Sequence, residues 1–161
     1  MLKSIVLLAS ITLVVQPAFA IETPRIIPRS ERVGHPIDQV FGTLKHYFND
    51  SSLSGFVLRS ADQKSWTLVA TRSDIDGANW NNWAFCKASA EQMIYRFEDG
   101  TATVTVQLQK AGAQATFMSV SADFQGTYTL GSQEARIDCT STGNMERDLI
   151  AVAGGSPKGT R

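Results

Sequence analysis

The sequence has few of the residues that active sites and metal centres use. It contains two histidines, and neither stands in an H-E-x-x-H or H-x-x-x-H arrangement. The nucleophile motifs G-x-S-x-G and S-x-x-K are absent, and no glycine-rich loop opens a helix after a strand. Asp74–Asn79 places its glycine two positions too early for a calcium loop. We therefore expect no catalytic residues, no metal site and no cofactor.

An excess of charge of one sign is also missing. The chain carries 15 basic and 15 acidic residues, which gives a formal net charge of zero at pH 7. Without residues 1–20, whose only charge is Lys3, 14 basic residues face 15 acidic ones, a net charge of −1. Such a balance provides no long-range attraction to nucleic acid or to an anionic membrane. We expect neither as the main partner.

Long apolar runs are absent except near the N-terminus. There Lys3 precedes the apolar run Ile5–Val15, Pro17 follows the run, and Ala18–Ala20 forms a small-x-small cleavage signature. The run is shorter than the about 20 residues that a membrane-spanning helix needs. We predict that residues 1–20 are a secretory signal peptide cleaved after Ala20. The mature protein is then periplasmic or secreted and has no transmembrane segment.

Cysteine is scarce as well, with Cys86 and Cys139 the only two in the chain. Two cysteines in an exported protein predict one structural disulfide, which closes a loop of roughly 50 residues. The competing interpretations are a redox pair and a metal-binding pair. Redox pairs usually have the spacing C-x-x-C, which these residues lack. A structural bridge is therefore the preferred prediction.

The chain after the signal peptide divides into an arm, one domain and a tail. Residues 21–35 contain prolines and arginines, which predict an extended arm. This arm is either a solvated leader or a docking segment centred on the apolar pair Ile26–Ile27. Residues 36–154 are long enough for one domain with a core, and residues 155–161 read as a flexible tail.

Two helices are predicted at the ends of this domain. Pro36 suits the start of the first helix, whose apolar side includes Leu44 and whose polar side includes Gln39. The second helix starts at Thr142 or Gly143 and ends at the glycine pair 154–155. The apolar positions recur at the three-and-four spacing of one helix face, namely Ile37, Val40, Phe41, Leu44, Tyr47 and Phe48 in the first helix and Met145, Leu149, Val152 and Ala153 in the second.

Alternating residues between the helices predict a run of strands. The predicted strands lie within 56–59, 66–71, 84–87, 93–97, 101–108, 118–124, 128–130 and 135–139. Asp99–Gly100 is typical of a hairpin turn, and Gly126 indicates a bulge. In 101–108 the apolar residues alternate with threonines and a glutamine, so one face is buried and one is wet. The fold class is α+β: an antiparallel sheet of about six to seven strands with an N-terminal and a C-terminal helix packed on it.

The most unusual composition lies at residues 79–83, where Trp80 and Trp83 alternate with Asn79, Asn81 and Asn82. We interpret this segment as a loop and as the candidate binding site, with Trp80 as an exposed anchor and Trp83 directed into the fold. Two other interpretations stay open. The tryptophans are core and edge packing, or their rings stack on sugars while the asparagine amides bind hydroxyl groups.

These observations favour an exported, non-catalytic protein that binds another envelope or secreted macromolecule. An accessory subunit and an inhibitor or immunity-type partner both fit, and its partner is then an envelope or secreted protein. The alternatives are a small periplasmic hydrolase built around His46 with an unrecognised site, and a glycan-binding module. A cleft that joins His46 to two carboxylates distinguishes the hydrolase, and an exposed recognition surface distinguishes the binding protein.

Overall fold

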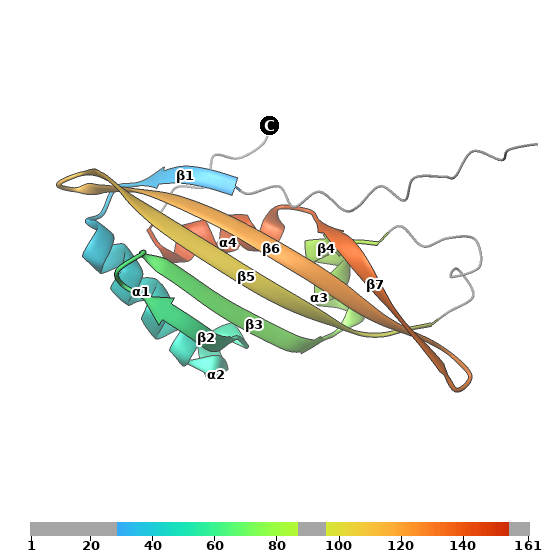
Figure 1. Cartoon of the computed structure of the whole chain (residues 1–161). Helices are drawn as coiled ribbons and strands as arrows, with labels where there is room; N and C mark the ends of the chain where they lie inside the picture. The colour runs from blue at the N-terminus through green and yellow to red at the C-terminus, as the bar shows by residue number, and fades with distance from the viewer. Residues whose placement is uncertain (1–28, 87–95, 155–161) are drawn as a thin grey trace, which may run out of the picture.

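The computed structural model describes residues 29–86 and 96–154 (Figure 1). The predicted signal peptide, most of the predicted arm and the tail at 155–161 lie outside the described residues. Seven strands and four helices follow one another in the order β1 (Arg29–Val33), α1 (Ile37–Asn49), α2 (Ser51–Ser54), β2 (Val57–Asp62), β3 (Thr67–Ile75), α3 (Gly77–Trp83), β4 (Ala84–Phe85), β5 (Arg96–Gly112), β6 (Ala115–Leu130), β7 (Gln133–Ser141) and α4 (Asn144–Val152) in the described residues.

All the strands belong to one antiparallel sheet, which confirms the predicted α+β class and its antiparallel sheet. The strand order is β2-β3-β5-β6-β7-β4, and β1 also pairs with β6. β5 and β6 form a long hairpin whose register runs from Arg96 opposite Thr129 to Gly112 opposite Ala115. β1 and β7 share the other edge of β6, β1 pairing with 116–120 and β7 with 124–130. Figure 1 shows this hairpin as the long axis of the molecule.

The two faces of the sheet differ sharply in burial. On β5 the predicted inward set, Ala102, Val104, Val106 and Leu108, is buried, whereas the alternate residues are half-buried or exposed. Figure 1 shows α1, α3 and α4 on one side of the sheet, behind the strands. We call this side the covered face and the opposite side the open face. An antiparallel sheet tolerates such asymmetry because its side chains alternate strictly between the faces.

The three-and-four spacing of apolar residues accounts for helix α1 and its buried side. Pro36 immediately precedes it, and its buried residues are Ile37, Val40, Phe41, Leu44 and Phe48. The chain turns at Asp50, whose Oδ1 accepts the backbone N–H groups of Ser52 and Leu53 and so caps the short helix α2.

In the described parts of the chain, no helix combines the length and apolar character needed to cross a membrane.

Part of the predicted arm, residues 29–33, forms strand β1. Arg29–Val33 pairs with β6, and Val33 is fully buried. The interpretation of the whole arm as a solvated leader is therefore wrong for this part. The burial of Val33 and the pairing of this segment with β6 together stabilise the segment in the sheet.

Two glycines have roles that differ from the predicted ones. Asp99–Gly100 is not a hairpin turn, because β5 continues through both residues. Gly126 is not at a bulge, since it lies directly opposite Gly100, and the register shift falls between Phe97 and Asp99. The local turn preference of Asp-Gly is overridden by the pairing of β5 with β6 along its full length.

Helix α4 begins with a hydroxyl bridge. Ser141 Oγ accepts the N–H of Gly143, 2.9 Å away, and donates to Glu146 Oε2 at 2.8 Å. Glu146 stands at the third helical position and is fully buried, with no partner for its Oε1 in the structure. The serine thus connects the two groups that bond directly in a capping box, which explains a carboxylate inside the fold.

Candidate functional site

The predicted Trp-Asn loop is a helix, α3. Asp76 caps it, with Oδ1 accepting the Asn79 N–H at 2.9 Å and Oδ2 accepting the Asn79 side-chain amide at 3.0 Å. Aspartate is a preferred N-cap because its carboxylate satisfies backbone donors that have no partner within the helix. The prediction of a loop is therefore wrong. Asp76 starts a helix at this point.

Trp80 is buried, with 3% of its surface exposed, so the prediction of an exposed anchor is wrong. Its indole covers the glycine pair Gly100 and Gly126, which face each other on β5 and β6. A Cβ at Gly100 would collide with the six-membered ring, and one at Gly126 would lie 3.2 Å from it. The pair is glycine because the ring occupies the space that side chains would need.

An aromatic cluster completes the surroundings of Trp80. Its ring stacks on Phe97 with centroids 5.4 Å apart and meets Phe124 edge-on at 5.7 Å. Phe97 in turn meets Tyr128 edge-on at 5.4 Å. Burial raises the pKa of the Tyr128 phenol, and a hydrogen bond with Trp80 opposes part of that rise. This geometry is that of a core, because stacked and edge-to-face rings contribute packing energy when water is excluded.

Trp83 packs against the edge of the core and is only partly buried. The guanidinium carbon of Arg72 lies 5.0 Å from the centroid of the Trp83 ring, and Arg72 Nη1 donates to the Ser54 carbonyl oxygen at 3.3 Å. The Trp83 indole nitrogen is buried without a hydrogen-bond partner in the structure. Arg72 therefore connects α2 to α3 through a cation–π contact and a hydrogen bond.

Two of the three asparagines of the segment, Asn79 and Asn82, make contacts that stabilise the local structure. Asn79 joins the cap of α3, as described above. The Asn82 carbonyl oxygen accepts from Thr142 Oγ1 at 2.6 Å and from the Asn144 amide at 2.7 Å, which fastens the end of α3 to the start of α4. Asn81 is exposed. Binding by this segment remains a prediction, now restricted to Asn81, Asn82 and the accessible part of Trp83.

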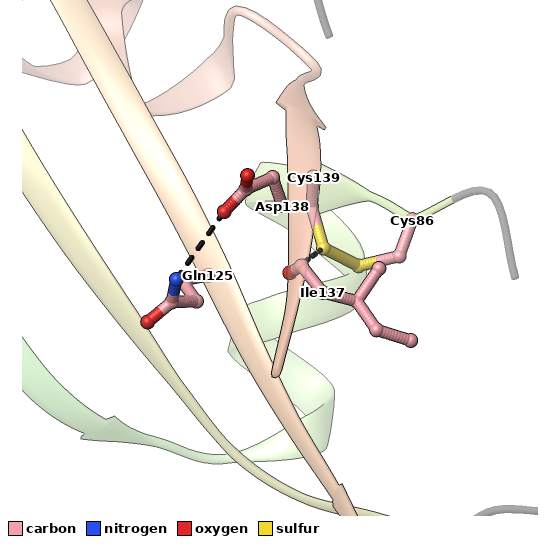
Figure 2. The surroundings of a disulfide bond; sticks show 5 residues. All are labelled: Cys86, Gln125, Ile137, Asp138 and Cys139. Carbon is pink, nitrogen blue, oxygen red and sulfur yellow. Dashed lines mark hydrogen bonds between the residues drawn. A yellow bond between two sulfur atoms is a disulfide. The ribbon is translucent and has the colours of Figure 1, made fainter. Parts of the chain in front are cut away.

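The predicted bridge between Cys86 and Cys139 is present, with the Cα atoms 4.3 Å apart (Figure 2). Cys139 lies on β7, and Cys86 directly follows β4, which pairs with β7. The Cys139 sulfur is 3.2 Å from the Ile137 carbonyl oxygen. A disulfide sulfur has no hydrogen to donate, so this is a van der Waals contact. The bridge joins the end of α3–β4 to the sheet across a loop of 53 residues.

The open face of the sheet presents a second group of side chains, separate from the Trp-Asn segment. Its central residues are Thr67, Val69 and Thr71 on β3, Thr101, Thr103, Thr105, Gln107 and Gln109 on β5, and Phe117, Ser119, Ser121, Asp123 and Gln125 on β6. Asp123 is the only ionisable residue of this central set, and charged residues pair with the set at its margins: Arg32 with Phe117, Asp62 with Thr67 and Asp138 with Gln125. Of the exposed large hydrophobic residues, Phe117 belongs to the set, Val57 pairs with Thr71, and Phe85 on β4 pairs with Thr140 of β7. Depletion of charge together with exposed aromatic rings is typical of recognition surfaces.

A shallow hollow lies on this face at the β1–β6–β5 end. It is lined by Ser30, Gln107, Gln109, Phe117, Met118 and Ser119, and we call it the Phe117 hollow. Phe117 is 51% exposed, whereas the Met118 side chain is fully buried on the covered face and reaches the hollow only through its backbone. Across the strands, Gln109 pairs with Phe117, and Phe117 pairs with Arg32. A ring exposed to this extent on a sheet is accessible to a partner.

The side chains of the hollow offer neutral hydrogen-bonding groups. Ser30 Oγ donates to Ser119 Oγ at 3.1 Å, which leaves the Ser119 hydroxyl proton for another acceptor. Within the described residues, the side-chain amides of Gln107 and Gln109 make no hydrogen bond. Each such amide presents two donors and a carbonyl acceptor. The hollow therefore combines one apolar ring with several unused donors and acceptors.

The titratable residues form no comparable site. Where the structure describes the chain, no three His, Cys, Asp or Glu residues gather closely enough to hold a metal ion. His46 is exposed on α1, and the charged group that it affects is Asp50. Hydrogen bonds from Ser52, aided by His46, lower the pKa of Asp50. These two side chains belong to the junction of α1 and α2 and not to a cleft.

The sequence contains a signal for the Phe117 hollow that composition did not bring out. Met118, Val120, Ala122 and Phe124 alternate along the sequence and are all buried, which puts Phe117 on the opposite side of the strand. A large apolar residue at an outward position of an alternating strand has no core to enter. Such a position is a candidate for contact with a further layer or with a partner.

Comparison with known proteins gives no family. The sequence matches no protein-family model, and no curated protein is significantly similar to it. Among solved structures, the chain is similar to a DUF4468 family protein from Bacteroides ovatus, with 6% identity and a TM-score of 0.44 over 88% of this chain and 92% of that chain. It is also similar to a TBP-like protein from Parabacteroides distasonis, with 7% identity and a TM-score of 0.39 over 70% of this chain and 65% of that chain. Both likenesses are too weak to carry a conclusion about function.

Proposed function

We propose that the protein is exported, loses residues 1–20 and works in the periplasm or in the medium. The support is the charged, apolar and small-residue order of the N-terminus together with the Cys86–Cys139 bridge. Disulfides persist in oxidising compartments and are rare where thiols are kept reduced. N-terminal sequencing of the exported protein tests this, and Ile21 is the expected first residue.

We further propose that the exported domain is a non-catalytic binding protein whose recognition surface is the open face. The single observation that carries the proposal is the exposed Phe117 beside the uncharged residues that line the hollow. A rigid sheet, with α1, α3 and α4 behind it, presents these side chains without rearrangement. Such preorganisation lowers the entropic cost of binding. The partner is an envelope or secreted macromolecule.

The experiment is affinity capture from an envelope extract with the exported protein as bait. Phe117→Thr is the informative variant because threonine suits a strand and removes only the ring. Leu53→Ala is the control, since Leu53 is a 65% exposed apolar residue on α2, outside the sheet. We expect capture by the wild type and by Leu53→Ala, and loss of capture with Phe117→Thr. Equal capture by all three proteins would refute the open-face proposal.

Strand β1 lies within the predicted arm at 21–35, so the choice of truncated bait depends on whether β1 is kept. Deletion of residues 21–35 removes β1 and therefore exposes the edge of β6 at Thr116–Val120. Such a bait tests stability as much as binding. Deletion of residues 21–28 alone leaves β1 in place and isolates any contribution of the Ile26–Ile27 segment.

A further inference from the structure

We propose that the Phe117 hollow binds an uncharged glycan, with one sugar ring packed on Phe117. This inference rests on the proposed function, because it names the class of macromolecule that the open face recognises. Protein recognition of the same surface is the competing outcome of the test.

The first argument is the absence of charge from the lining. Ser30, Gln107, Gln109, Phe117 and Ser119 supply all the side chains that reach the hollow, and none of them ionises. A phosphate or carboxylate ligand would lose its hydration without gaining an opposite charge. Arg32 is exposed beside Phe117, but it is not part of the lining. A neutral ligand is the complement of a neutral hollow.

The second argument is the pairing of a ring with amides and hydroxyls. Sugars present a C–H face that packs on an aromatic ring and a rim of hydroxyl groups that donate and accept hydrogen bonds. Phe117 supplies the ring, 51% exposed, and Gln107 and Gln109 supply amides with no partner in the described structure. An apolar surface with a few directional polar groups is the usual composition of a small-ligand site.

The third argument is geometry. The hollow is lined by the cross-strand pairs Gln107–Ser119 and Gln109–Phe117 on β5 and β6, and Ser30 on β1 extends the first pair. Arg32 on β1 lies opposite Phe117, outside the lining. Adjacent strands are about 4.8 Å apart, so three strands span about 10 Å. That width accepts one or two sugar rings. Because the hollow is shallow and lies on an open sheet, a chain of further sugars has room to continue along the face.

The probes are cellohexaose, maltohexaose and chitohexaose, with polygalacturonate as an anionic control. The exported full chain is titrated with each probe, and dissociation constants are measured by calorimetry and by backbone amide shifts. We expect saturable binding of at least one neutral probe and shifts centred on 107–109 and 117–119. Phe117→Thr and the double variant Gln107→Ala/Gln109→Ala should each weaken binding by about tenfold or more. Leu53→Ala, at an exposed position on α2, should bind like the wild type.

Several outcomes overturn the inference. These are no binding of any neutral probe, binding that is unchanged in Phe117→Thr, or binding of polygalacturonate alone. If no glycan binds while capture from the extract still depends on Phe117, the glycan inference is wrong and the proposed binding function stands with a protein partner. If neither the probes nor the extract give Phe117-dependent binding, both proposals fail.

Discussion

Two aromatic residues near opposite ends of the β5–β6 hairpin have opposite surroundings. Trp80 comes from α3 and lies on the covered face over Gly100 and Gly126, whereas Phe117 projects from β6 into the open face. Trp80 is 3% exposed and Phe117 is 51% exposed. The difference shows that ring type and local composition do not decide between packing and recognition. The space that distant strands leave around the ring decides it.

The largest expected effect is the loss of the buried ring. Trp80→Ala should lower the free energy of unfolding by about 3–5 kcal/mol, because it leaves a cavity over the glycine pair and removes the stacking with Phe97. Urea unfolding followed by circular dichroism measures the change. A loss of about 0.5 kcal/mol or less, the range of ordinary surface substitutions, would show that Trp80 does not belong to the core.

Phe117 and Met118 are adjacent on β6 and test the contrast between an exposed and a buried side chain within one strand. Met118→Ala should cost about 2–5 kcal/mol because Met118 is fully buried. Phe117→Thr should change stability by about 0.5 kcal/mol or less, because the ring is exposed and threonine suits a strand. Both values come from the same unfolding assay. Similar losses from the two variants would mean that the open face is covered in the native protein.

A glycine substitution sharpens the account of the Trp80 site. Gly100→Ala should destabilise the wild type by about 1–3 kcal/mol, because the new Cβ collides with the indole. In the Trp80→Ala background the same change should be neutral or stabilising by up to about 1 kcal/mol, since glycine within a strand is costly. A double-mutant cycle measures this reversal. Additive effects of the two changes would contradict direct contact.

The smallest expected effect is a pH dependence at Tyr128. Burial raises its folded-state pKa above the unfolded value of about 10, so its stabilising contribution is complete below that pH. The contribution is lost as the pH rises through the raised pKa, because the unfolded state releases its proton first. Tyr128→Phe should therefore unfold with a weaker pH dependence than the wild type above pH about 10. Identical pH profiles for the two proteins would remove Tyr128 from the buried cluster.

Local patterns were sufficient for much of the fold. The apolar spacing of α1 predicts a helix with the buried residues that the structure shows, including Leu44. The alternation of 101–108 identifies the buried and the open side of β5. The cysteine count predicts the bridge, because two cysteines in an oxidising compartment have a single possible pairing. These features depend on neighbours in sequence or on chemistry that leaves one solution.

Long-range contacts account for the failures. Asp99–Gly100 has the composition of a turn, but Gly100 is required by an indole twenty positions earlier in the chain. The tryptophan-asparagine segment looks exposed by composition, yet the Asp76 cap orients α3 so that Trp80 faces the sheet. The open-face site needs β1, β5 and β6 to be placed side by side, and no local pattern gives that pairing.

Hydroxyl-radical footprinting of the exported protein, free and after incubation with envelope extract, tests the central claim directly. Mass spectrometry then measures oxidation at Phe117 and at Trp80 in the same sample. We predict that Phe117 is oxidised in the free protein and protected in the extract, while Trp80 is protected in both. Oxidation of Trp80 in the free protein, or unchanged oxidation of Phe117 in the extract, would contradict the assignment of one ring to the core and the other to recognition.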